Sequence, residues 1–86
     1  MSENDRLSGR QIAAGRVLAG LSQSVLAARA KISVPTLRRM EAAEGASGGY
    51  INNVSAVRRA LEAEGIEFLN HGEPGVRLKS KRASEG

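Results

Sequence analysis

The pattern of apolar and polar positions is clearest between Ser22 and Glu41, where it predicts two short helices joined by a tight turn. Ser22 and Ser33 each precede one helical pattern and are good N-caps, because a serine hydroxyl accepts hydrogen bonds from the free N–H groups of a first turn. Pro35 falls in the first turn of the second helix, where its missing N–H costs nothing. The side chains expected on the buried face are Leu26, Ala27, Ala30, Ile32, Leu37 and Met40, and those expected on the outer face are Gln23, Arg29, Arg38 and Arg39.

A longer helix is predicted before this pair, from about Gly9 to Ala19. Ser8 and Gln11 have the spacing of a capping box at its start, and Gly20 is a suitable residue to end it. The stripe expected to be buried consists of Ile12, Ala13 and Val17, with Ala19 at its end.

Another amphipathic helix is predicted from about Tyr50 to Glu64, followed by Gly65 as its stop. Arg58 and Glu62 are four residues apart in it and are expected to pair on the surface. Its apolar positions recur at three- and four-residue spacing, as expected for one buried face, at Ile51, Val54, Val57, Ala60 and Leu61.

The period then changes to that of strands. Residues 66–69 and 76–79 alternate in character, and the residues between them are rich in turn formers. A small β-hairpin is therefore predicted. Because an isolated two-stranded ribbon is marginal in water, the hairpin is expected to pack on the helices or on a second copy of the chain.

Length and composition indicate one small domain without covalent support. The chain has 86 residues, a formal net charge of +4 and no cysteine, which excludes disulfides and thiolate metal sites. Residues 1–7 are expected to be disordered and residues 80–86 to form a loose basic tail. With no apolar leader and no run of membrane-spanning length, the expectation is a soluble, cytoplasmic protein with no membrane association.

Several positions in and before the helix pair carry a family resemblance. They are Gln23 opening the first helix, the small Ala27, Ile32 and Ser33 entering the second helix, Leu37 and the closing Glu41, and upstream Arg16 followed by Gly20-Leu21-Ser22-Gln23. Over roughly residues 8 to 65 the chain resembles the phage repressors, Cro proteins and bacterial relatives of the XRE family of helix-turn-helix regulators. One position departs from the pattern: Lys31 stands where the family usually has Gly, and a Lys with φ > 0 carries strain.

The resemblance implies a fold and an ion pair. The fold is a mainly α, four-to-five-helix repressor/Cro-like helix-turn-helix domain over residues 8–65, with a short C-terminal β-hairpin over residues 66–79 as a possible dimerisation element. The ion pair joins Arg16 to Glu41 and ties the first and third helices together. Residues 42–49, rich in glycine, have two interpretations: main chain that approaches DNA phosphates, or a plain connector.

The resemblance also implies a DNA-reading surface on the second helix of the pair. Ser33, Val34 and Pro35 are expected to reach base edges, followed one turn later by Arg39. Arg39 is the strongest candidate, because a guanidinium can bond both O6 and N7 of guanine and so discriminate by about 1–3 kcal/mol. Val34 is expected to touch a thymine methyl group.

Phosphate contacts are expected beside these base contacts. Arg38 and Gln23 are placed by the resemblance near the DNA backbone, and Thr36 can bond phosphates or bases. The basic residues near the C-terminus, from Arg77 to Arg82, add either non-specific phosphate attraction or solubility.

No catalytic or metal-binding constellation is recognisable in the sequence. His71 is the only histidine, so neither a metal site nor a Ser-His-Asp arrangement is expected, and no cofactor is implied. The expected function is a transcriptional regulator, a repressor or autoregulator, that binds double-stranded palindromic DNA as a homodimer. The alternative is a protein-interaction module of the same fold, an antitoxin or antiactivator with a protein partner. RNA binding has little support, because the chain has only one Tyr and one Phe for stacking.

Overall fold

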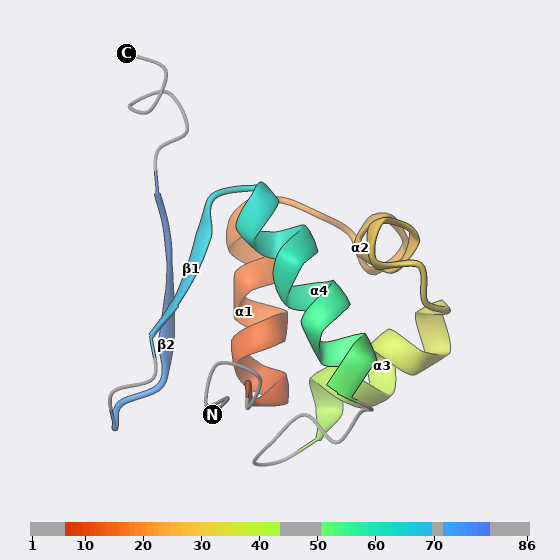
Figure 1. The fold of residues 1–86 in the computed structure, drawn as a ribbon, viewed down its shortest axis with the longest axis horizontal. Coiled ribbons are helices and arrows are strands. Elements are labelled where there is room, and N and C mark those ends of the chain that lie inside the picture. Colours follow the sequence, from red (N-terminus) through yellow and green to blue (C-terminus); the bar gives the residue numbers. More distant parts are fainter. Residues whose placement is uncertain (1–6, 44–50, 70–71, 80–86) are drawn as a thin grey trace.

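A computed structural model describes residues 7–43, 51–69 and 72–79. This part of the chain is mainly α-helical and carries one small antiparallel hairpin, as the sequence predicts (Figure 1). The elements are α1 (Gly9–Ala19), α2 (Gln23–Ala30), α3 (Val34–Ala42), α4 (Ile51–Ala63), β1 (Ile66–Leu69) and β2 (Gly75–Leu78). The expectations for residues 1–6, for most of the 42–49 segment, for Tyr50, for His71 and for the tail of residues 80–86 lie outside the described residues.

The predicted caps are confirmed at the starts of three helices. Ser8 and Gln11 form both bonds of a capping box: the Ser8 hydroxyl accepts from Gln11 N–H, and Gln11 Oε1 accepts from Ser8 N–H, each at 3.0 Å. Ser22 accepts from the N–H of Val25 at 3.1 Å in the same way. The residue before the first cap departs from expectation. Leu7, predicted to belong to a disordered segment, is fully buried, because it takes the position of a hydrophobic staple before the cap of α1.

The core lies where α1, α2, α3 and α4 meet the inner face of the hairpin. Its buried members are all aliphatic or Met side chains: Leu7, Ile12, Leu26, Ala27, Ala30, Leu37, Met40, Val54, Val57, Leu61 and Ile66. The prediction for α1 is wrong at Val17, which is 66% exposed. The side of α1 that faces the core runs instead through Ile12 and Gly15, where a Cβ on Gly15 would lie 3.3 Å from Ile66 Cγ2.

The start of α1 lies directly against the end of α3. A Cβ atom on Gly9 would lie 2.3 Å from the carbonyl oxygen of Met40 and 2.6 Å from that of Glu41. Real Cβ atoms do not approach oxygen so closely, so only glycine lets these two backbones meet. This contact fixes the end of α3 to the central helix.

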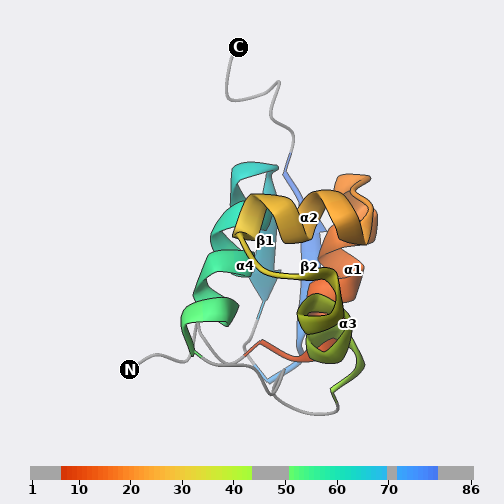
Figure 2. The same ribbon diagram turned by 90° about the vertical axis from the view of Figure 1, so that its right-hand side faces the viewer.

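The hairpin packs against α1 and α4. β1 and β2 pair antiparallel, with Ile66 opposite Leu78 and Phe68 opposite Val76. Ile66, Phe68 and Val76 belong to the core or pack against it. The second strand begins one residue earlier than predicted, because Gly75 pairs with Leu69. Figures 1 and 2 place the hairpin on one side of α1 and the α2–α3 pair on the other.

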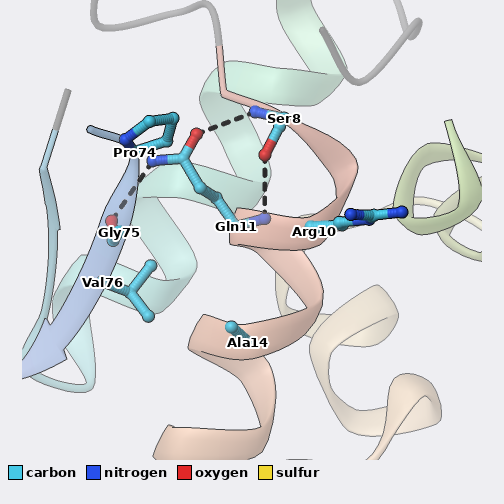
Figure 3. A pocket seen from close by; sticks show the side chains of 7 residues that line it. All are labelled: Ser8, Arg10, Gln11, Ala14, Pro74, Gly75 and Val76. Atoms are coloured by element: carbon cyan, nitrogen blue, oxygen red, sulfur yellow. Dashed lines mark hydrogen bonds between the residues drawn. The ribbon is translucent and has the colours of Figure 1, made fainter. Parts of the chain in front are cut away.

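Gln11 ties the turn end of the hairpin to α1. It is only 5% exposed, and its Nε2 donates to the carbonyl oxygens of Leu69 and Gly75, both at 3.2 Å. Figure 3 shows the bond to Gly75. Because its Oε1 is used by the capping box, one side chain satisfies main-chain groups of the helix and of both strands.

Candidate nucleic-acid interface

The second and third helices form one continuous outer surface. Figure 2 shows α2 and α3 on the same side of the molecule, joined by a short turn and in front of the other elements. Lys31 ends α2 with φ 61° and ψ 43°, a left-handed conformation that brings the chain sharply round. The N–H of Ile32 then donates to Ala27 O at 3.0 Å. This bond satisfies a carbonyl at the end of α2.

The start of α3 is closed by its own side chains. The Ser33 hydroxyl accepts from Thr36 N–H at 3.2 Å and donates to Thr36 Oγ1 at 2.9 Å. Pro35 follows in the first turn, as the sequence predicts. Ser33 and Pro35 are exposed, whereas Thr36 is half-buried.

A polar cluster under this surface holds three helices together. Arg16 of α1 meets Glu41 of α3 in two bonds, from Nε to Oε2 at 2.8 Å and from Nη2 to Oε1 at 3.1 Å. Its Nη1 also donates to Leu21 O at 3.1 Å, and Gln23 of α2 donates to Glu41 Oε1 at 3.0 Å. The side chains of Arg16 and Glu41 are 18% and 8% exposed, so the pair is shielded from water. The cluster therefore fixes the orientation of α3 relative to α1 and α2.

The residues proposed to read DNA do not all lie on the outer face. Arg38 and Arg39 are exposed, and neither forms a hydrogen bond or ion pair with any residue that the structure describes. Val34 is half-buried and packs against the core, which is at odds with its expected contact to a thymine methyl. Gln23 is also half-buried, and its amide is used by Glu41.

Two cationic residues near α3 differ from what the sequence alone predicts. Arg29, expected on the outer face, is exposed there but pairs with Glu64 at the end of α4. Lys31 was of interest only as a departure from glycine, yet its exposed side chain adds a positive charge at the turn. The sequence signal for this exposed charge is the position of Lys31 in the turn between the two predicted helices.

The described residues bear on two further kinds of feature: clustered metal ligands and membrane-spanning helices. They contain no group of three or more His, Asp or Glu side chains placed to hold a metal ion. None of the helices in these ranges has the length and apolar character needed to cross a bilayer.

Comparison with known proteins identified no relative of this chain. No protein-family model matches the sequence, and no curated protein is significantly similar to it.

Proposed function

We propose that the chain is a sequence-specific DNA-binding regulator of transcription, of the repressor/Cro type, whose α2 and α3 form a helix-turn-helix. The observation that carries this proposal is the outer face of α3, where Arg38 and Arg39 are exposed and have no carboxylate partner among the described residues. In the proposed complex α3 lies in the major groove, where a helix fits and where each base pair has its own pattern of donors and acceptors.

The charges of this face suit a phosphate-lined groove. Arg38, Arg39 and Lys31 are all exposed on α3 or on the turn before it, and Glu41, the acidic residue of α3, is engaged underneath by Arg16. The N-terminus of α3 adds its partial positive charge, although Pro35 has no N–H and the N–H of Thr36 is bonded to the Ser33 hydroxyl. Positive potential of this kind supplies most of the affinity for any DNA, and it steers the protein onto the duplex.

Sequence discrimination is assigned to the exposed residues of α3. Arg39 is proposed to bond a guanine, with Ser33 and Pro35 at the neighbouring base edges and Arg38 on a phosphate. Val34 is assigned to packing, because its side chain turns partly to the core. The polar cluster of Arg16, Gln23 and Glu41 would keep α3 at a constant angle, which base reading requires.

A second copy of the chain completes the proposed complex. One helix of nine residues supplies few base contacts. A homodimer on a palindromic operator doubles them, with half-sites about one helical turn, roughly 34 Å, apart. The proposed role is repression or autoregulation from such an operator.

The proposal is tested by selecting duplexes from a random-sequence pool and measuring their affinity by fluorescence anisotropy. Arg39→Ala should weaken binding of the selected duplex by about ten- to a hundredfold and relax its sequence preference at one position. Arg59→Ala removes the same charge from an exposed position on α4, outside α3 and outside the hairpin, and serves as the matched control. It should cost only a small, sequence-independent loss.

The salt dependence separates the two functions left open by the sequence. DNA binding should weaken steeply between about 50 and 200 mM salt, because bound phosphates release counterions. If no duplex is enriched from the pool, or if Arg39→Ala binds the selected duplex as tightly as the wild type, the DNA-reading role is wrong. The protein-interaction module, an antitoxin or antiactivator, would then be the better proposal.

A further inference from the structure

The side of the molecule formed by α1 and β2 is apolar and open. A hollow of about 350 Å³ lies between the two elements, lined by Ser8, Arg10, Gln11, Ala14, Pro74, Gly75 and Val76 (Figure 3). Ala14 is exposed beside it, and further along α1 Val17 and Leu18 are 66% and 45% exposed. On β2, Leu78 is 48% exposed although it belongs to the same strand face as the core-packing Val76. Exposed aliphatic side chains thus gather beside one strand.

The main chain of that strand is also open on one side. Lys79 N–H donates to Gly65 O at 2.7 Å, so the hydrogen-bonded pairs of the hairpin are those of Arg77 with Glu67 and Gly75 with Leu69. The N–H and C=O groups of Val76 and Leu78 therefore point away from β1. The described sheet has only two strands, so this edge has no partner strand among the described residues.

We infer that this α1–β2 surface is the homodimer interface, in which β2 pairs antiparallel with β2 of a second copy about a two-fold axis at Val76. The two hairpins would form one four-stranded sheet, and the exposed flanks of the two α1 helices would meet over it. This inference rests on the proposed function only for the role of the dimer in DNA binding. The interface itself is argued from the exposed side chains and the open strand edge of a single copy.

The sequence of the strand is self-complementary in this register. With Val76 opposite its own copy, Gly75 would lie opposite Arg77 within the two strands. Just before β2 begins, Pro74 would lie opposite Leu78, where its carbonyl can accept although it has no N–H to donate, and Glu73 would lie opposite Lys79. Apolar residues thus face apolar ones, each arginine faces a glycine, and each exposed carboxylate faces an exposed ammonium group. A register centred one residue later would place Arg77 against its own copy, and like charges directly opposite each other are destabilising.

The second copy also accounts for features that a monomer leaves unexplained. A two-stranded sheet is marginal in water, and an open strand edge next to exposed aliphatic side chains favours pairing with another chain. An antiparallel pairing of one strand with itself obeys two-fold symmetry, so the same patch serves both copies. The α2–α3 surface remains free, because it lies on the other side of α1 (Figure 1).

The first experiment measures mass in solution without DNA, by light scattering and sedimentation over a range of concentrations. The wild type should be dimeric, and Leu18→Glu should raise the dimer dissociation constant at least tenfold. Val25→Glu is the matched control, because Val25 is also an exposed apolar residue, at 40%, but lies on α2. Monomers at every concentration, or equal weakening by both variants, would overturn the inference.

The second experiment tests the register by cross-linking, which is clean because the natural chain has no cysteine. Residues 75 and 77 of opposite copies would form a non-hydrogen-bonded pair, whose Cα separation of about 4.5 Å suits a disulfide. A Cβ on Gly75 would meet only Leu69 Cδ1, at 3.8 Å, so cysteine fits there. Gly75→Cys protein mixed with Arg77→Cys protein should cross-link on oxidation, and each variant alone should not. A mixture that cross-links no better than either variant alone would disprove this register.

A charge exchange checks the same pairing. Lys79→Glu should weaken the dimer roughly tenfold by placing two carboxylates opposite each other, and Glu73→Lys in the same chain should restore it. A double variant as weak as Lys79→Glu would contradict the pairing. A dimer of this kind that binds no DNA would disprove the proposed function alone, and a monomer that binds a single half-site would disprove the interface alone.

Discussion

Lys31 holds a backbone conformation that glycine adopts at no steric cost. Its φ of 61° is the only positive value at a non-glycine residue in the described ranges. Its side chain is exposed and has no bonded partner among the residues described, so the fold gains little from a lysine at this position. The proposed benefit is electrostatic, since the side chain stands at the turn before α3.

We therefore expect Lys31→Gly to stabilise the fold by about 0.5–1 kcal/mol while weakening DNA affinity slightly. The free energy of unfolding in urea measures the first effect. Ala28→Gly, at an exposed position inside α2, is the control and should destabilise by about 1 kcal/mol. A Lys31→Gly variant less stable than wild type would show that the strain at Lys31 is smaller than the entropy that glycine adds to the unfolded chain.

Glu41 is the acceptor of the polar cluster under α3. Its carboxylate accepts from both Arg16 and Gln23 and is almost completely shielded from water. Glu41→Ala should cost about 2–3 kcal/mol, because it leaves a shielded guanidinium without its partner. Thermal and urea unfolding measure the loss.

The control for this change is an exposed carboxylate. Glu67 accepts from Arg77 at 2.8 Å, but the side chains of Glu67 and Arg77 are 37% and 63% exposed, so Glu67→Ala should cost much less than Glu41→Ala. Equal losses for the two variants would mean that the cluster under α3 is no stronger than a surface pair.

At the scale of elements, the hairpin depends on one side chain from α1. Gln11 bonds carbonyl groups of both strands and the N–H of Ser8. Gln11→Met keeps the length of the side chain and removes the amide, so we expect a loss of about 2 kcal/mol from unsatisfied main-chain groups. Amide hydrogen exchange should show the loss first in β1 and β2. Uniform exchange throughout the chain, with unchanged stability, would contradict this role.

The outer face of the hairpin carries a pH-sensitive pair. The hydrogen bond from the Arg77 side chain, at 2.8 Å, is the main cause that lowers the pKa of Glu67; desolvation opposes it, and the charges of Arg77 and Lys79 add smaller effects that lower the pKa further. The ionised carboxylate is therefore favoured by folding. Its contribution is fully present above the usual pKa of about 4.5 and is lost as the pH falls through the lowered value.

Glu67→Gln should accordingly reduce stability slightly at neutral pH and leave it unchanged at strongly acidic pH. Urea midpoints of wild type and variant, measured from pH 7 downward, should converge as Glu67 becomes protonated. Curves that stay parallel through the acidic range would rule out this linkage.

At the scale of the whole molecule, α1 stands between two surfaces with different proposed tasks. The α2–α3 surface faces one way and the hairpin the other (Figures 1 and 2). Core packing and the Arg16–Glu41 pair connect them through α1. A dimer formed on the α1–β2 side would hold two α3 helices in one fixed arrangement, so that two weak half-site contacts become one strong one.

This coupling predicts that Leu18→Glu weakens operator binding without touching α3. Affinity for a palindromic duplex should fall by about a hundredfold, whereas affinity for an isolated half-site should stay within about twofold of wild type. Anisotropy titrations with the two duplexes make the comparison. Equal losses on both duplexes would place Leu18 in the structure of the monomer, not in the coupling.

The sequence by itself determined the helices and their ends. Ser8, Ser22 and Ser33 act within their own first turns, and Gly20 ends α1 through its own backbone, so local pattern was enough. The hairpin followed from alternation and turn composition, although β2 begins one residue earlier than predicted. Caps and turns are contacts between residues three to five apart, which a single sequence displays directly.

Only the tertiary structure decided which faces are buried and which polar groups are free. Val17 has the spacing of a core residue but faces outward, and Leu7 lies outside every predicted helix but is buried. Arg29 looks as free as Arg39 in the sequence, yet it meets Glu64, 35 residues away. Such pairings depend on how the described helices are packed against the hairpin. No local pattern encodes that packing, because each contact joins residues that are distant along the chain.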